Sequence, residues 1–178
     1  MWSTESRWST STCGRSRVAS SAPLKVYFDA CVFLAWFLDE PGRVEHSAAA
    51  ILSAEQHISQ GHISALTVAE VIGAANLRAP QGPPLPEHEK RLDRARDYFL
   101  ASPFRFVDIT QRASAFAMDY AIAFQLKGPD ALHLALAKMS GCRELHTYDD
   151  DLLKVGTQVD GLVVREPWGN PQLDLLDP

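Results

Sequence analysis

The stretch "VYFDACVFLAWFL", residues 26–38, is the most apolar run of the chain and indicates its fold class. It is too short to cross a bilayer as a helix, and it carries Asp29 in its interior. It is better explained as part of a buried strand over 24–28 that runs into a short helix over 31–38. A strand that leads directly into a helix is a building unit of parallel α/β sheets, and Asp29 lies at the junction.

The same alternation continues along the chain. The segments "HIS" (62–64), "FRFVDI" (104–109), "RELHT" (143–147) and "LVVR" (162–165) are predicted as further strands. Helical patterns are found at 43–56, 66–78, 88–102, 111–126 and 129–141, with a proline-rich loop at 79–87. The 178 residues are 46% hydrophobic and 22% charged, which suits one domain with a full core. We therefore expect a single α/β domain over 23–165, with a mostly parallel sheet flanked by helices on both faces.

The two ends of the chain differ in composition from this domain. Residues 1–22 are rich in Ser, Thr and Arg, and they lack the apolar centre of a secretory signal. Their composition could pass for an organelle transit peptide, but we expect a disordered leader or an upstream start codon. The tail "EPWGNPQLDLLDP" (166–178) extends past the last predicted strand, as a strap or as a partner contact.

Charge and cysteine content narrow the class of protein. The formal net charge of −5 gives no overall basic field for nucleic acid, although a local basic patch can accompany an acidic, metal-binding cleft. The three cysteines are widely spaced and form no CxxC pair, and the six histidines form no HExxH motif. These features argue against a disulfide framework and a zinc site, and they fit a reducing cytoplasm without a membrane span.

Carboxylates gather where the predicted strands end. Asp29 closes the first strand, Glu70 lies one turn into the helix after the second, Asp130 opens a later helix, and the run 149–151 follows the fourth strand. Taken singly, each has a structural explanation: a helix cap, a capping box between Thr67 and Glu70, or a favourable helix dipole. In open parallel sheets, however, sites form outside the carboxyl ends of the strands.

If the sheet brings these acids together, their charges need a counterion. Unit charges a few ångströms apart repel by about 4 kcal/mol per pair at an effective dielectric of about 20. A protein relieves this by raising pKa values or by binding a hard cation. Carboxylates without a His or Cys cluster suit Mg²⁺, for which Mn²⁺ can substitute. Because such an ion binds phosphates and activates water, phosphodiester hydrolysis is the natural reaction.

Four segments resemble, in order and spacing, the acidic motifs of PIN-domain nucleases, and most closely those of VapC-type toxins. They are "VYFDACVFL", "SALTVAEV", "LKGPDALHLALA" and "LHTYDDDLL", and the resemblance covers about residues 24–165. It implies a PIN-like domain with a five-stranded parallel sheet. It also implies a Mg²⁺-dependent endoribonuclease that cleaves single-stranded RNA, is inhibited by a cognate antitoxin protein, and forms a homodimer.

The resemblance assigns catalytic roles to Asp29, Glu70, Asp130 and Asp149, with Asp29, Asp130 and Asp149 as the metal ligands. The family's last motif, T-x-D-x-x-L, is satisfied by "TYDDDL" (147–152) with Asp149 as its acid. We expect Asp150 and Asp151 to lie in the opening turn of a short helix, where they cap it and interact with water. The alternative is that Asp151 reaches the metal while Asp149 is the cap.

Two further residues invite a functional interpretation. Cys31 stands where the family commonly carries a hydroxyl or amide side chain, which puts support for Asp29 in doubt. No basic residue accompanies Cys31 locally, so a small buried core cysteine is the preferred interpretation over a catalytic one. His133, one turn after Asp130, could orient substrate, but a histidine satisfied at the edge of the core is the better explanation.

Two other function classes stay open. A phosphohydrolase of the haloacid-dehalogenase type also has an acid after its first strand, but its D-x-D motif is replaced here by "DAC" (29–31). A non-catalytic RNA- or protein-binding module could retain the fold without the activity. Activity as a function of divalent metal concentration discriminates among the three classes.

Overall fold

Five parallel strands form the central sheet of the computed structural model, which describes residues 22–78 and 86–168. They are β1 (Leu24–Phe28), β2 (Ser59–Ser64), β3 (Arg105–Val107), β4 (Glu144–His146) and β5 (Val163–Arg165). Their order across the sheet is β3-β2-β1-β4-β5, with β1 at the centre. The predicted five-stranded parallel sheet is confirmed.

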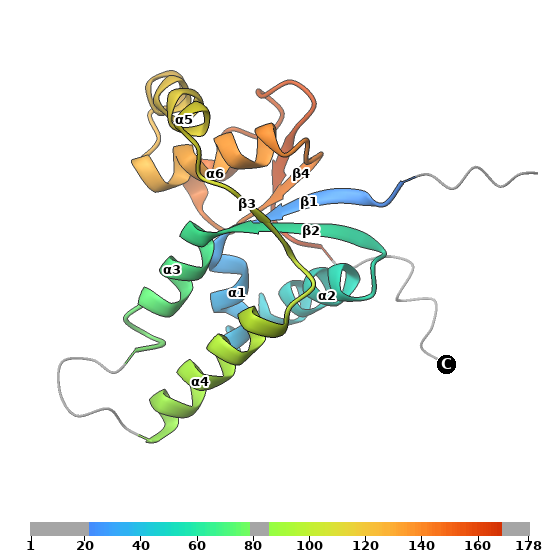
Figure 1. Ribbon diagram of the computed structural model, residues 1–178, viewed down its shortest axis with the longest axis vertical. Helices are drawn as coiled ribbons and strands as arrows, with labels where there is room; N and C mark the ends of the chain where they lie inside the picture. The colour runs from blue at the N-terminus through green and yellow to red at the C-terminus, as the bar shows by residue number, and fades with distance from the viewer. Residues whose placement is uncertain (1–21, 79–85, 169–178) are drawn as a thin grey trace, which may run out of the picture.

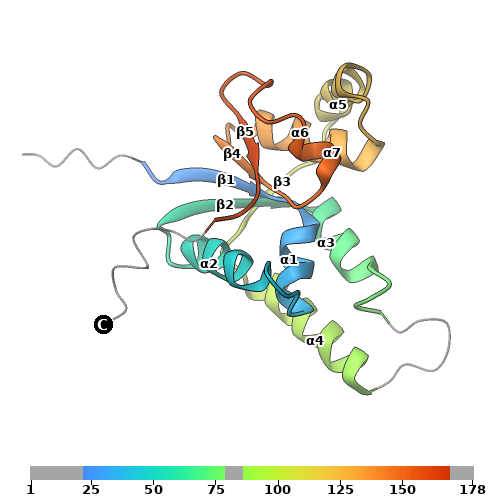
Figure 2. The same ribbon diagram turned by 180° about the vertical axis from the view of Figure 1, so that it is seen from behind.

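Helices cover both faces of this sheet, as predicted (Figures 1 and 2). On one side lie α1 (Ala30–Phe37), α2 (Val44–Glu55), α3 (Ala65–Gly73) and α4 (Pro86–Ala101); on the other lie α5 (Gln111–Phe124), α6 (Gly128–Met139) and α7 (Asp150–Leu153). Strand β1 serves both cores because successive side chains of a strand point to opposite faces. Val26 and Phe28 pack with the first helix group, whereas Tyr27 packs with the second.

The connection from β2 to α3 differs from its prediction. The strand begins at Ser59 instead of residue 62, and α3 ends at Gly73 instead of residue 78. Ser64 and Thr67 form the capping box of α3, each side chain accepting a hydrogen bond from the other's backbone N–H. The capping box proposed between Thr67 and Glu70 is therefore wrong, and the Glu70 carboxylate is not needed to cap α3.

The domain boundaries stay predictions. Of the predicted leader only residue 22 is described, the tail is described only as far as Trp168, and 79–85 of the proline-rich loop lie outside the described residues. Among the described helices, none is long and apolar enough to cross a membrane.

Candidate active site

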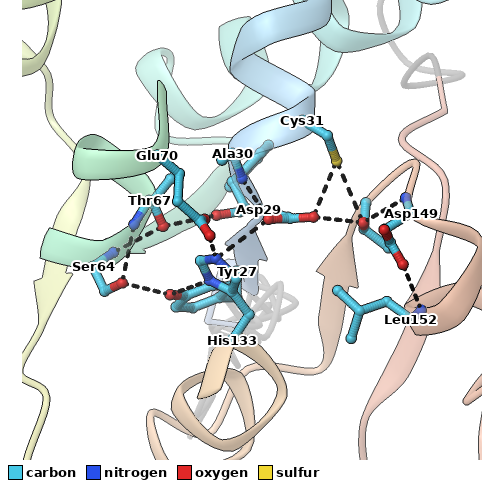
Figure 3. Close-up of polar contacts among 12 residues, drawn as sticks. Tyr27, Asp29, Ala30, Cys31, Ser64, Thr67, Glu70, His133, Asp149 and Leu152 are labelled. Atoms are coloured by element: carbon cyan, nitrogen blue, oxygen red, sulfur yellow. Dashed lines mark hydrogen bonds and ion pairs between the residues drawn. The ribbon is translucent and has the colours of Figure 1, made fainter. Parts of the chain in front are cut away.

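The carboxyl edge of the sheet brings together side chains that are far apart in the sequence (Figure 3). Strands β1, β2 and β4 all end at this edge because they run parallel. Asp29, Glu70 and Asp149 line one cleft of about 450 Å³. Asp130 lies in the first turn of α6, and burial, followed by the negative charges of Asp149 and Asp29, raises its pKa. Four predicted acids thus share one region.

Asp29 is the most firmly held of these acids. Its residue is only 6% exposed, which is rare for a carboxylate unless it is well paired. It is the N-cap of α1, and its Oδ1 accepts a hydrogen bond from the Ala30 N–H at 2.6 Å. Its backbone N–H donates to the His146 carbonyl at 3.0 Å. The predicted structural role of Asp29 as a cap therefore coexists with its place in the cleft.

The second oxygen of Asp29 accepts two side-chain hydrogen bonds. The Thr147 hydroxyl donates to Oδ2 at 2.7 Å, and the Cys31 thiol donates to it at 3.1 Å. The Cys31 sulfur in turn accepts from the Tyr148 N–H at 3.0 Å. Burial, followed by the negative charge of Asp29, raises the pKa of Cys31, so the group is a neutral thiol. The interpretation of Cys31 as a core cysteine holds in part, because it packs against one core cluster, but it is only half-buried and also lines the cleft.

His133 lies beneath the acids and contacts two of them. Its Nε2 is 2.7 Å from Glu70 Oε2 and 3.4 Å from Asp29 Oδ1 (Figure 3). Its Nδ1 is 3.1 Å from the Tyr27 hydroxyl, which donates its own proton to Ser64 Oγ. Both ring nitrogens therefore face acceptors, and this arrangement favours the imidazolium form.

The charge environment of His133 agrees with that form. Burial lowers its pKa, but the hydrogen bond to Glu70 and the charges of Asp29, Glu70 and Asp130 outweigh burial and raise the pKa overall. The residue is 1% exposed and is satisfied, as expected from the sequence, but its partners are the candidate site's acids. In the sequence, only the one-turn spacing of His133 from Asp130 indicated that His133 lies near the site. The contact with Glu70, 63 positions away, could not be predicted from that spacing.

Asp130 is the least satisfied carboxylate of the group. Burial, then the charges of Asp149 and Asp29, raises its pKa from 3.8 to about 6, against smaller opposing effects of Lys127 and His133. Its Oδ2 is buried and has no hydrogen-bond partner among the described residues. A carboxylate in this state gains most from a nearby cation.

The aspartate run divides its roles differently from the prediction. Asp149 is the N-cap of α7, and its Oδ1 accepts from the N–H groups of Asp151 and Leu152 at 2.8 and 3.1 Å. Asp150 and Asp151 lie in the first turn of α7, as predicted, but the prediction that they cap it is wrong, and Asp149 as the cap was the alternative. Asp151 instead accepts from the exposed Lys154 ammonium at 2.7 Å. Asp149 nevertheless lines the cleft, so capping uses one of its oxygens without removing the carboxylate from the site.

The donor set fits a hard divalent cation. One ligand atom each from Asp29, Glu70 and His133 lies within 4.8 Å of the others. Because the imidazolium form of His133 has no lone pair for a metal, the carboxylates are the donors, and Asp130 and Asp149 add two of them nearby. The four carboxylates outnumber the cations that act on them, His133 and Lys127, so the region stays negative even when His133 is charged. Oxygen-rich sites of this kind suit Mg²⁺ or Mn²⁺. Which of these acids would contact the ion stays a prediction.

Comparisons with known proteins agree with this geometry. A family model described as PIN domain matches residues 26–158. A toxin–antitoxin complex from Klebsiella pneumoniae contains a similar chain, with 23% identity, TM-score 0.56, and coverage of 82% of this chain and 99% of that one. VapC20 of Mycobacterium tuberculosis, described as a sarcin–ricin loop cleaving toxin, shows 15% identity and TM-score 0.55, with 71% and 91% coverage. VapBC2 from Rickettsia felis, bound to a promoter DNA fragment, shows 13% identity and TM-score 0.56, with 80% and 98% coverage.

Each of these three structures is identical to this chain at fewer than a quarter of the aligned residues. The likeness therefore supports the fold alone. No curated protein sequence matches the chain significantly. The match to the family model covers most of the described domain and includes Asp29, Glu70, Asp130 and Asp149.

Proposed function

This chain belongs to the PIN domain family, and from this premise we propose that it is a divalent-metal-dependent endoribonuclease and the toxin of a toxin–antitoxin pair. The observation that carries the proposal is the cleft lined by Asp29, Glu70 and Asp149, with the half-buried Asp130 nearby. The Oδ2 atom of Asp130 is buried without a partner among the described residues, and the pKa of the group is raised. The sarcin–ricin loop cleaving toxin among the similar structures supports RNA as the substrate class. Family membership argues against the haloacid-dehalogenase alternative.

In this proposal each residue has a distinct task. Asp29, Asp130 and Asp149 would hold the metal, which supplies Lewis acidity and lowers the pKa of bound water. Thr147 and Cys31 fix the orientation of the Asp29 carboxylate. The Glu70 side chain is 32% exposed, and Oε2 is bound to His133, which leaves Oε1 to accept a proton from an attacking water. The cleft at these acids then admits the phosphate backbone of single-stranded RNA.

Cleavage of single-stranded RNA by the purified protein should require Mg²⁺ or Mn²⁺. Without the cation, the clustered carboxylates repel both one another and the substrate phosphates. Incubation with EDTA should abolish cleavage, and added Mg²⁺ or Mn²⁺ should restore it, as followed on a labelled oligonucleotide. The Asp130→Asn protein, purified in parallel, controls for contaminating nucleases.

Three outcomes would contradict the proposal in different ways. Full activity in EDTA would exclude the metal mechanism. Hydrolysis of phosphorylated small metabolites without RNA cleavage would favour a phosphohydrolase. Binding of RNA without cleavage at any metal concentration would favour a non-catalytic module with the PIN fold.

The antitoxin is proposed to inhibit by placing a basic side chain in the cleft. A guanidinium pairs bidentately with carboxylates and would compete with the metal for Asp29, Glu70 and Asp130. The similar chain in the Klebsiella toxin–antitoxin complex supports a protein partner of this kind. The affinity for the partner, measured by calorimetry, should fall as ionic strength rises, because salt screens such pairs. An inhibitory complex with no basic partner residue near these acids would refute the proposal.

Two further expectations stay predictions. A homodimer would have an apolar surface available on α5, where Met118 and Ile122 are 62% and 80% exposed. Sedimentation equilibrium of the purified protein would test it. A cytoplasmic location is proposed from the unpaired cysteines Cys31 and Cys142, and cell fractionation would test it.

A further inference from the structure

We propose that Cys31 is a positioning residue that couples the first acid of the site, Asp29, to the chain segment that carries the last, Asp149. The inference rests on the proposed function for its effect on RNA cleavage, but its geometry and its effect on metal binding can be measured separately. Nothing in the family resemblance assigns a role to a thiol at this position, where hydroxyl or amide side chains are common.

The contacts of Cys31 extend in two directions. Its thiol donates to Asp29 Oδ2 at 3.1 Å, and its sulfur accepts from the Tyr148 N–H at 3.0 Å (Figure 3 shows the contact with Asp29). Tyr148 immediately precedes Asp149 in the chain. One side chain at the first turn of α1 thus links the carboxyl ends of two neighbouring strands, β1 and β4.

Thr147 makes a second link between the same two acids, at the same edge of the sheet. Its hydroxyl donates to Asp29 Oδ2 at 2.7 Å and accepts from the Asp149 N–H at 2.9 Å, and it lies 3.4 Å from the Cys31 sulfur. Two side chains therefore hold the same pair of acids in register. Because the thiol is the weaker hydrogen-bonding group, Cys31 should contribute less than Thr147 but should not be dispensable.

A packing role is the competing explanation, since Cys31 also packs at the edge of a core cluster. If Cys31 only packs, Cys31→Ala should lower stability without changing metal affinity. Cys31→Ser, which places a hydroxyl there, should then lower stability more than Cys31→Ala. If Cys31 positions the site, Cys31→Ala should lose more metal affinity than Cys31→Ser, because serine retains a donor and an acceptor and alanine has neither.

Cys142 offers a matched control within the same chain. It is also a free cysteine, 2% exposed, but it lies in the other core cluster and its side chain contacts Ser140. Cys142→Ala should lower the thermal midpoint and leave metal affinity unchanged. Any general effect of removing a buried thiol is thereby separated from an effect on the site.

The experiment is a Mn²⁺ titration of the full chain by electron paramagnetic resonance, without RNA. Cys31→Ala should raise the dissociation constant about tenfold, the lower end of the range for residues that orient ligands. Cys31→Ser should stay within about threefold of the wild type, since a hydroxyl can make both contacts. Wild-type affinity in Cys31→Ala, or an equal loss in Cys142→Ala, would overturn the inference.

A second measurement needs neither metal nor activity. The S–H stretching band of Cys31, assigned by its loss in Cys31→Ser, should lie below that of a free thiol in the metal-free protein, because the group donates to a carboxylate. A free-thiol frequency would overturn the inference even if no variant lost metal affinity. If the wild type binds Mn²⁺ and shows the shifted band but cleaves no RNA, the proposed function fails and the positioning role of Cys31 stands.

Discussion

Replacing Asp130 by asparagine is expected to abolish metal-dependent RNA cleavage while leaving the fold at least as stable as before. Asn keeps the size of the side chain and removes the negative charge that would hold the cation. Residues that only orient metal ligands change activity by about 10–100-fold, so removal of a ligand charge should cost at least about a hundredfold. RNA cleavage measured over a range of Mg²⁺ concentrations, with thermal unfolding of the same samples, tests both parts.

The stability part has a defined pH dependence in EDTA. Burial and the charges of Asp149 and Asp29 raise the pKa of Asp130 to about 6, so its ionised form is disfavoured in the folded protein. Above about pH 6 the ionised group lowers the free energy of unfolding, and protonation between pH 6 and 4 relieves this cost. The wild type should therefore gain stability, relative to Asp130→Asn, as the pH falls through this window.

An exposed acid on α4 provides the matched control. Asp93→Asn removes the same charge from a solvent-exposed position, and it should leave both cleavage and its metal dependence unchanged. If Asp130→Asn remains folded and cleaves RNA at the wild-type rate, Asp130 does not serve the metal site. A large loss of stability in Asp130→Asn at neutral pH would instead show that its carboxylate has a structural partner.

The sequence predicted the sheet well because its signals are local. An apolar run that ends at Asp29 marks β1, and parallel strands such as β1 and β4 bring their carboxyl ends to one edge whatever the loops between them do. The same rule predicts from the sequence that Asp29, Glu70, Asp130 and the aspartate run lie in one region. Element ends were less accurate, as at α3, where a Ser64–Thr67 cap replaced the expected one.

The contacts that hold the site could not be predicted, because they join residues distant in the sequence. Cys31 meets Tyr148 across 117 positions, and His133 meets Tyr27 across 106. Both residue types are common in cores, so local sequence favoured the structural interpretation for each. In the folded protein the same side chains are satisfied by partners from the site, and structural and functional roles are therefore not alternatives here.

Asparagine at position 149 should separate the two roles of that aspartate. Asp149 Oδ1 caps α7 through the N–H groups of Asp151 and Leu152, and Asn and Asp are about equally good N-caps. Asp149→Asn should therefore unfold at nearly the wild-type temperature, yet need at least about tenfold more Mg²⁺ for RNA cleavage, because the charge at the cleft is lost. Asp149→Ala loses the cap as well, at about 0.5–2 kcal/mol of stability.

Asp151→Asn is the comparison that decides which aspartate serves the metal. The Asp151 carboxylate accepts from Lys154 on the exposed side of α7, and that pair lowers its pKa. Asp151→Asn should leave the Mg²⁺ requirement unchanged, because it removes a negative charge that faces Lys154. If Asp151→Asn raises the Mg²⁺ requirement and Asp149→Asn does not, Asp149 is only a helix cap. The metal site then extends one turn further along the chain, and Lys154 must release Asp151 before the cation can bind.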